Sequence, residues 1–204
     1  MKYQKAKEAV RYLLSANALF MESHGLEDFT PFLTAQEPRV TVVSCSDSRV
    51  HMRAIHDNPV NDLFVIRNIG NQLNTAMGSV EYAVSHLRTP VLLILGHVRC
   101  GAIHAASGDY SGESPSIRRE LETLQVPKGG NWLDGVRDNV NRQVAAAIER
   151  FSPQVESGAL AVLGAIYDFA NDLGEGHGKL VITNIQGESE PHAIKAAIAI
   201  HIKP

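Results

Sequence analysis

Residues 91–95 form the apolar run Val-Leu-Leu-Ile-Leu, which constrains the fold more than any other segment of the chain. The run shows no alternation of apolar and polar side chains, so a strand with this sequence must be buried on both faces. Strands of that kind occur in parallel sheets that helices cover. The run therefore predicts an α/β fold with this segment inside a parallel sheet.

Other apolar segments alternate with amphipathic ones along the chain. Strands are predicted at residues 40–44, 63–67, 91–96 and 179–185. Helices are predicted at residues 5–21, 75–88, 116–124, 136–150 and 189–202, the third with Ser114 as N-cap before Pro115. This order predicts a mostly parallel central sheet flanked by helices.

Residues 160–169 suit either a buried helix or a strand. The turn-forming residues 171–178 follow, and then comes the strand at 179–185. A turn between two apolar segments favours a hairpin. We therefore expect a strand at 160–169 and an antiparallel edge hairpin late in the chain.

Size and charge narrow the classes of function. The chain has 204 residues and no linker rich in Gly, Ser or Pro, so a single domain over residues 1–204 is expected. The formal charge of −3 argues against a nucleic-acid partner. No apolar run approaches the roughly 18 residues that cross a bilayer, and Lys5, Lys7 and Glu8 interrupt any apolar signal segment. We therefore expect a cytoplasmic protein without a membrane partner.

Both cysteines follow predicted core strands. Cys45 comes directly after residues 40–44, and His97 and Cys100 follow residues 91–96. Because the carboxyl ends of parallel strands meet at one edge of a sheet, these three side chains can lie together. Two thiolates and an imidazole suit Zn²⁺ and leave one coordination position open. Asp47 or another histidine could instead close the site, and either cysteine could be a buried apolar side chain.

Asp47 and Arg49 follow the first cysteine closely. From there the carboxylate can reach the open position, where it can bind the metal or accept a hydrogen bond from a metal-bound hydroxide. Arg49 can hold the carboxylate in a bidentate pair and keep it ionised. The alternative is an ordinary ion pair in a loop after a strand.

Four segments then carry a resemblance. They are Ser-Cys-Ser-Asp-Ser-Arg-Val at 44–50, Phe-Val-Ile-Arg-Asn-Ile-Gly-Asn at 64–71, Ser-Val-Glu-Tyr-Ala-Val at 79–84 and Gly-His-Val-Arg-Cys-Gly-Ala at 96–102. In this order they resemble the β-class carbonic anhydrases. The resemblance implies a zinc enzyme that reversibly hydrates CO2 to bicarbonate and a proton. It implies one Zn²⁺ per chain on Cys45, His97 and Cys100, with zinc-bound hydroxide oriented by the catalytic pair Asp47 and Arg49.

The same resemblance implies a homodimer or a higher homo-oligomer with active sites at the subunit interface, and the helix at 5–21 packed on the partner subunit. It also implies a narrow substrate pocket lined by Gln36, Phe64, Ile69, Tyr82 and Gly101. Val98 and Arg99 depart from the family pattern, in which many members have Ser after the ligand histidine. This departure leaves the hydrogen bonding beside the pocket open.

Three other functions remain open from the residues. The same zinc site could hydrolyse CS2 or COS, which are close electronic relatives of CO2. A site closed by Asp47 would make a non-catalytic, zinc-stabilised binding protein. A thiol redox protein that uses Cys45 and Cys100 is disfavoured because the chain has no Cys-x-x-Cys motif.

Overall fold

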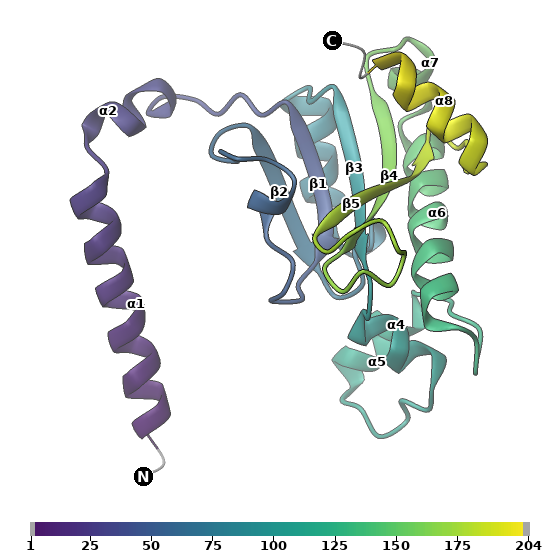
Figure 1. Cartoon of the computed structure of the whole chain (residues 1–204), viewed down its shortest axis with the longest axis horizontal. Helices are drawn as coiled ribbons and strands as arrows, with labels where there is room; N and C mark the ends of the chain where they lie inside the picture. Colours follow the sequence, from purple (N-terminus) through teal and green to yellow (C-terminus); the bar gives the residue numbers. More distant parts are fainter. Residues whose placement is uncertain (1–2, 202–204) are drawn as a thin grey trace. The chain divides into compact units, whose positions relative to one another are not determined.

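The computed structural model describes residues 3–201, which fall into two units that meet between Glu37 and Pro38. The first unit contains helix α1 (Gln4–Ser23), the short helix α2 (Leu26–Phe29) and a 3₁₀ turn, η1 (Thr30–Phe32) (Figure 1). The helix expected at 5–21 is therefore present and slightly longer at both ends. No residue of α1 is buried, although its sequence is rich in apolar side chains.

The second unit is built on a five-stranded sheet with the order β2-β1-β3-β4-β5 (Figure 1). The strands are β1 (Val40–Cys45), β2 (Leu63–Asn68), β3 (Val91–His97), β4 (Ala161–Asp168) and β5 (Lys179–Ile185). Strands β2, β1, β3 and β4 pair in parallel, whereas β5 pairs antiparallel with β4 at the edge. The predicted fold class is confirmed, including the strand at 160–169 and the late edge hairpin.

The central strand β3 is buried on both faces, as its sequence predicts. Leu92 and Ile94 are fully buried in the cluster that contains the apolar face of α6. Leu93 and Leu95 point to the opposite face and are 6% and 1% exposed. Both side-chain sets of one strand therefore contribute to the core, which explains why the run lacks polar residues.

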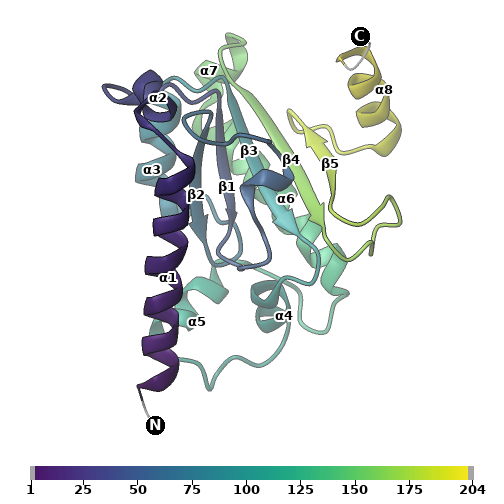
Figure 2. The ribbon, with the colours of Figure 1, turned by 60° about the vertical axis from the view of Figure 1, so that its left-hand side comes forward.

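Helices and turns connect the strands of the second unit, and one helix follows its last strand. They are η2 (Met52–Ala54), η3 (Asn74–Ala76), α3 (Met77–Glu81), the π-helical turn η4 (Tyr82–His86), α4 (Gly101–Ser107), α5 (Pro115–Glu122), α6 (Trp132–Arg150), α7 (Ser152–Glu156) and α8 (Pro191–His201). Helix α6 runs along β3 and β4 (Figure 2). Ser114 caps α5 as predicted, because its Oγ accepts a hydrogen bond from the Ile117 N–H. Within residues 3–201, no helix is both long enough and apolar enough to cross a membrane.

Two predicted helices differ from the observed ones. The segment 75–88 is divided into η3, α3 and η4. Its last part is a π turn because Thr89 donates to the carbonyl of Ala83, and the Leu87 N–H bonds to the Tyr82 carbonyl instead. Helix α6 starts before the expected Val136, because the Asn131 side chain accepts from the N–H groups of its first turn. The last residue of the helix expected at 189–202 lies outside the described residues.

Helix α6 approaches the sheet closely at glycines of β3 and β4. A Cβ atom on Gly164 would lie 2.7 Å from Cγ1 of Val140, 2.9 Å from Cβ of Asn184 and 3.1 Å from Cγ2 of Val144. A Cβ atom on Gly96 would lie 2.7 Å from Cγ2 of Val140. The absence of side chains at these two positions therefore determines how near α6 lies to the strands that end at the site.

Replacing Gly164 with alanine should destabilise the protein by about 1–3 kcal/mol, because the added methyl group has no room between α6 and β5. The measurement is the urea midpoint of unfolding at an unchanged slope. Gly112→Ala is the matched control, since a Cβ atom there meets no atom within 4 Å. Equal midpoints for the two variants would contradict the close helix–sheet approach.

Candidate active site

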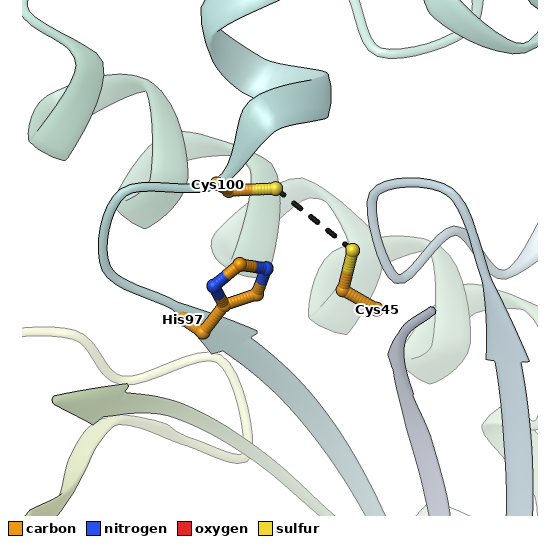
Figure 3. A group of neighbouring side chains, drawn as sticks. All are labelled: Cys45, His97 and Cys100. Carbon is orange, nitrogen blue, oxygen red and sulfur yellow. Dashed lines mark hydrogen bonds between the residues drawn. The ribbon is translucent and has the colours of Figure 1, made fainter. Parts of the chain in front are cut away.

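Three potential metal ligands meet at the carboxyl edge of the parallel sheet. Cys45 is the last residue of β1, and His97 is the last residue of the neighbouring strand β3. The chain then turns back, so that Cys100 lies directly before α4. Figure 3 shows the three side chains pointing toward one another. The expectation that two strand ends bring these residues together is therefore met by the geometry.

The donor atoms of this cluster are close and shielded from solvent. All of them lie within 4.8 Å of one another, and the three residues are buried. The two Sγ atoms are 4.0 Å apart, and both cysteines are free. This spacing is far longer than a disulfide of about 2.05 Å. It is close to the ~3.8 Å that separates two thiolates on one tetrahedral zinc with Zn–S bonds of about 2.3 Å.

His97 presents a free nitrogen to the cysteines. Its Nδ1 lies 2.9 Å from the carbonyl oxygen of Val98, and because a carbonyl only accepts, Nδ1 must carry the proton. Nε2 is then a lone-pair donor, and it is buried without a hydrogen-bond partner among residues 3–201. A buried nitrogen with no partner costs free energy unless something else binds it. The donor set therefore fits a soft divalent metal ion such as Zn²⁺.

The pKa values of the two thiols are shifted in opposite directions. The hydrogen bond from Cys100 lowers the pKa of Cys45, and the same interaction raises the pKa of Cys100. Two thiolates this close repel each other, so the second ionises only when a cation compensates. A bound dication would therefore displace the remaining proton.

Asp47 and Arg49 form a tightly bonded pair at the rim of the cluster. Arg49 donates from Nε to Oδ1 of Asp47 at 2.9 Å and from Nη2 to Oδ2 at 2.6 Å, and its backbone N–H also reaches Oδ1. These hydrogen bonds hold the pKa of Asp47 well below its usual range. The stabilisation is therefore complete above the unfolded-state pKa of about 3.9 and is lost as the pH falls below it. Oδ2 of Asp47 lies 3.9 Å from Nε2 of His97.

Two further residues contact the site and were not among its expected catalytic, metal or pocket residues. Arg67 donates to the carbonyl oxygens of Cys45 and Asp47, at 3.1 and 2.7 Å, and so supports the segment that carries both. Phe169 directly follows β4, and its ring stacks on His97 with centroids 6.2 Å apart. Both residues lie at the carboxyl end of a parallel strand, and Arg67 also belongs to the segment 64–71 that carries the family resemblance.

The expected pocket residues do not form one cluster as the potential metal ligands do. Phe64 and Tyr82 are neighbours, with ring centroids 6.1 Å apart. Ile69 follows the end of β2 and is 37% exposed, and Gly101 is the exposed first residue of α4. Gln36 is exposed and belongs to the first unit. Among these residues, Phe64 and Tyr82 contact each other. A single substrate pocket lined by all of them stays a prediction.

Comparison with known proteins agrees with this site. Residues 40–175 match the sequence model of a family described as carbonic anhydrase. A carbonic anhydrase of Mycolicibacterium smegmatis is 41% identical over 163 residues, which are 73% of this chain and 79% of that protein. Carbonic anhydrase 2 of Mycobacterium tuberculosis is 32% identical over 146 residues, which are 65% and 70% of the two chains.

The fold has close structural relatives as well. One is a structure from a study of two tetrameric β-carbonic anhydrases of Sordaria macrospora, with a TM-score of 0.71 and 24% identity, covering 86% of this chain and 96% of that chain. The matched residues 40–175 include all the donors of the cluster and the Asp47–Arg49 pair. On this sequence match and this fold, the chain belongs to the family of β-class carbonic anhydrases.

Proposed function

We propose that the chain catalyses the reversible hydration of CO2 to bicarbonate and a proton, with one Zn²⁺ held by Cys45, His97 and Cys100. The observation that carries this proposal is the buried cluster, whose donor atoms lie within 4.8 Å of one another. When bound, Zn²⁺ supplies a Lewis acid that lowers the pKa of water from 15.7 to about 7. Three protein ligands leave room for such a water.

Asp47 is the proposed orienting group for that water. An ionised carboxylate is only a hydrogen-bond acceptor, so a water or hydroxide beside it must point a proton at Asp47 and a lone pair elsewhere. The carboxylate lies at the cluster, with Oδ2 3.9 Å from Nε2 of His97. In this role Asp47 would hold the proton of a water at the open position and leave an oxygen lone pair facing the CO2 carbon.

Arg49 is the proposed partner that keeps Asp47 ionised and aligned. Both carboxylate oxygens accept hydrogen bonds from Arg49, which leaves Asp47 engaged with the guanidinium. This pairing favours an open metal position over a site that Asp47 closes. It therefore supports the enzyme over the non-catalytic binding protein.

The substrate pocket is proposed to be apolar because CO2 is small and apolar. Phe64 and Tyr82 contact each other near the start of β2, where Phe64 pairs with Thr41, whereas Ile69 follows the end of that strand. A partner subunit would therefore have to bring the aromatic pair to the cluster. An apolar lining excludes water from the reacting atoms and strengthens the electrostatic contribution of Asp47. Gly101 lies beside the last ligand, and a Cβ atom there would meet no atom of this chain within 4 Å.

We also propose that the enzyme is a homodimer or a larger homo-oligomer in which α1 packs on a partner subunit. Several large apolar side chains of α1 are highly exposed, among them Val10 at 54%, Leu13 at 65% and Leu14 at 68%. Exposed apolar surface of this kind indicates an interaction site. A relative of similar fold is described as tetrameric, which supports the assembly.

The ligand set predicts one metal ion per chain. Co²⁺ added to the metal-free protein should bind in a one-to-one ratio and produce thiolate-to-cobalt charge-transfer absorption. Cys45→Ser and Cys100→Ser should each lose most of that absorption and most of the zinc of the purified protein, because a hydroxyl is a poor replacement for a thiolate. His104→Gln is the matched control, as His104 is exposed on α4 and lies outside the cluster. Full zinc in both serine variants would refute the ligand set.

The role of the pair predicts a loss of turnover without a loss of metal. Arg49→Ala should keep its zinc and hydrate CO2 about 10²-fold more slowly, because the misaligned carboxylate no longer orients the attacking oxygen. Stopped-flow hydration assays and zinc analysis measure the two effects, and Arg53→Ala is the control at a nearby exposed arginine. Normal turnover in zinc-replete Arg49→Ala would show that the pair is only a loop ion pair.

Sulfide release from CS2 or COS that exceeds CO2 hydration would reassign the substrate.

The exposed face of α1 predicts an association that depends on apolar contact. Leu13→Asp combined with Leu14→Asp should lower the mass in sedimentation equilibrium to that of a smaller species, because buried carboxylates oppose packing. Ser15→Asp, a polar position of the same helix, should keep the assembly. A wild-type protein that is fully active as a monomer at assay concentration would contradict the proposal.

A further inference from the structure

The turn that follows β4 is held by a buried carboxylate that the mechanism does not use. Asp168 is fully buried and ends the strand. Its Oδ1 accepts from the backbone N–H groups of Ala170 and Asp172, and its Oδ2 accepts from that of Leu173 at 2.7 Å. Three backbone hydrogen bonds to one buried anion give this turn a defined shape. The backbone of this turn is therefore fixed beside the site, and so are the positions from which its side chains start.

Phe169 is the first side chain that the turn presents. The guanidinium carbon of Arg49 lies 4.7 Å from the centroid of its ring. A guanidinium over an aromatic face gains a cation–π interaction and is limited in how it can tilt. One face of the Arg49 guanidinium is therefore covered by the turn after β4.

Asp172 is the second side chain, and it pairs with Arg99 in the loop between His97 and Cys100. Arg99 donates from Nε and from Nη2 to the two carboxylate oxygens, each at 2.9 Å. The backbone of Arg99 has a φ of 53°, in the left-handed region. Its carbonyl oxygen accepts a hydrogen bond from Nη2 of Arg49 at 3.0 Å. Asp172 therefore fixes the side chain of Arg99, and the carbonyl oxygen of Arg99 accepts a hydrogen bond from Arg49.

We propose that Asp172 and Arg99 are positioning residues for Arg49 and, through it, for Asp47; this inference rests on the proposed function. The guanidinium of Arg49 contacts the carboxylate of Asp47, the ring of Phe169 and the carbonyl of Arg99. Asp172 controls the last of these through the Arg99 side chain. Without Asp172, the cation of Arg99 loses its partner and repels Arg49, so the guanidinium samples more orientations.

Stability is a poor measure of this role. The Arg99 side chain is 57% exposed, and exposed ion pairs contribute little to the free energy of unfolding. A small misplacement of a catalytic group, in contrast, has a large effect on rate. The pair should therefore affect turnover much more than unfolding.

The first test compares turnover in matched variants. Asp172→Ala should hydrate CO2 about tenfold more slowly, equal to about 1.4 kcal/mol, with unchanged zinc content and unchanged melting temperature. Asp172→Asn, which keeps one acceptor oxygen, should fall between this variant and the wild type, and it serves if the alanine variant does not fold. Asp134→Ala removes the carboxylate of another exposed arginine pair, on α6, and should leave turnover unchanged. Turnover in Asp172→Ala equal to that of Asp134→Ala would overturn the proposal.

The second test observes Arg49 itself, in the metal-free and the zinc-loaded protein. The Arg49 Nε–H signal in ¹⁵N NMR is assigned by its loss in Arg49→Ala. In Asp172→Ala it should shift toward the position of free arginine or broaden, and in Asp134→Ala it should stay in place. An unchanged Arg49 signal in Asp172→Ala would overturn the proposal, whatever the activity.

A double-mutant cycle separates this inference from the proposed function. In an Arg49→Ala background, Asp172→Ala should cause no further loss of turnover, because the residue acts only through Arg49. A further tenfold loss would show an independent role and would overturn the proposal. Normal turnover in Arg49→Ala alone would refute the proposed catalytic pair, and the NMR test would still decide whether Asp172 positions Arg49.

Discussion

Parallel pairing of β1, β3 and β4 is the constraint on which the site depends. The strands start level with one another, since Val40 pairs with Val91 and Val91 pairs with Ala161. They therefore end at the same edge of the sheet, at Cys45, His97 and Asp168. Because each strand must be buried on both faces, few polar residues lie inside these segments, and the potential metal ligands lie at their carboxyl ends. The chemistry of the protein is concentrated there for that reason.

The polar groups at this edge do not satisfy one another completely. In the part of the chain that the structure describes, buried Nε2 of His97 has no hydrogen-bond partner, and the two thiols cannot both ionise unaided. A structure selected for stability alone would avoid such a combination. Around it, by contrast, Arg67, Arg49 and Asp168 hold backbone and carboxylate groups with many hydrogen bonds. Residues with many hydrogen bonds thus surround a cluster whose polar groups are incompletely hydrogen-bonded, as expected of a site that binds a ligand.

Local sequence signals predicted most of the elements of the sheet unit. Strands were recognised by apolar runs, and α5 was recognised by Ser114 and Pro115, because these signals act between near neighbours. Helix α4 was missed since its seven residues are too few to show a helical period. The π turn at Tyr82–His86 was missed because it depends on Thr89 competing for a carbonyl, which no periodicity reveals.

The sequence alone determined the α/β class, the strand ends and the candidate donors Cys45, His97 and Cys100, because residue type and spacing report burial and ligand chemistry. The spacing of Asp47 and Arg49 suggested a carboxylate held by an arginine, and the resemblance to a family favoured a catalytic role over an ordinary loop ion pair. Only the tertiary structure decided how the Arg49 guanidinium is enclosed. Phe169 and Asp172 reach it from the end of β4, and Arg99, 73 residues before Asp172, reaches it from the end of β3. Contacts over such a separation follow from strand order and register, which no local pattern encodes.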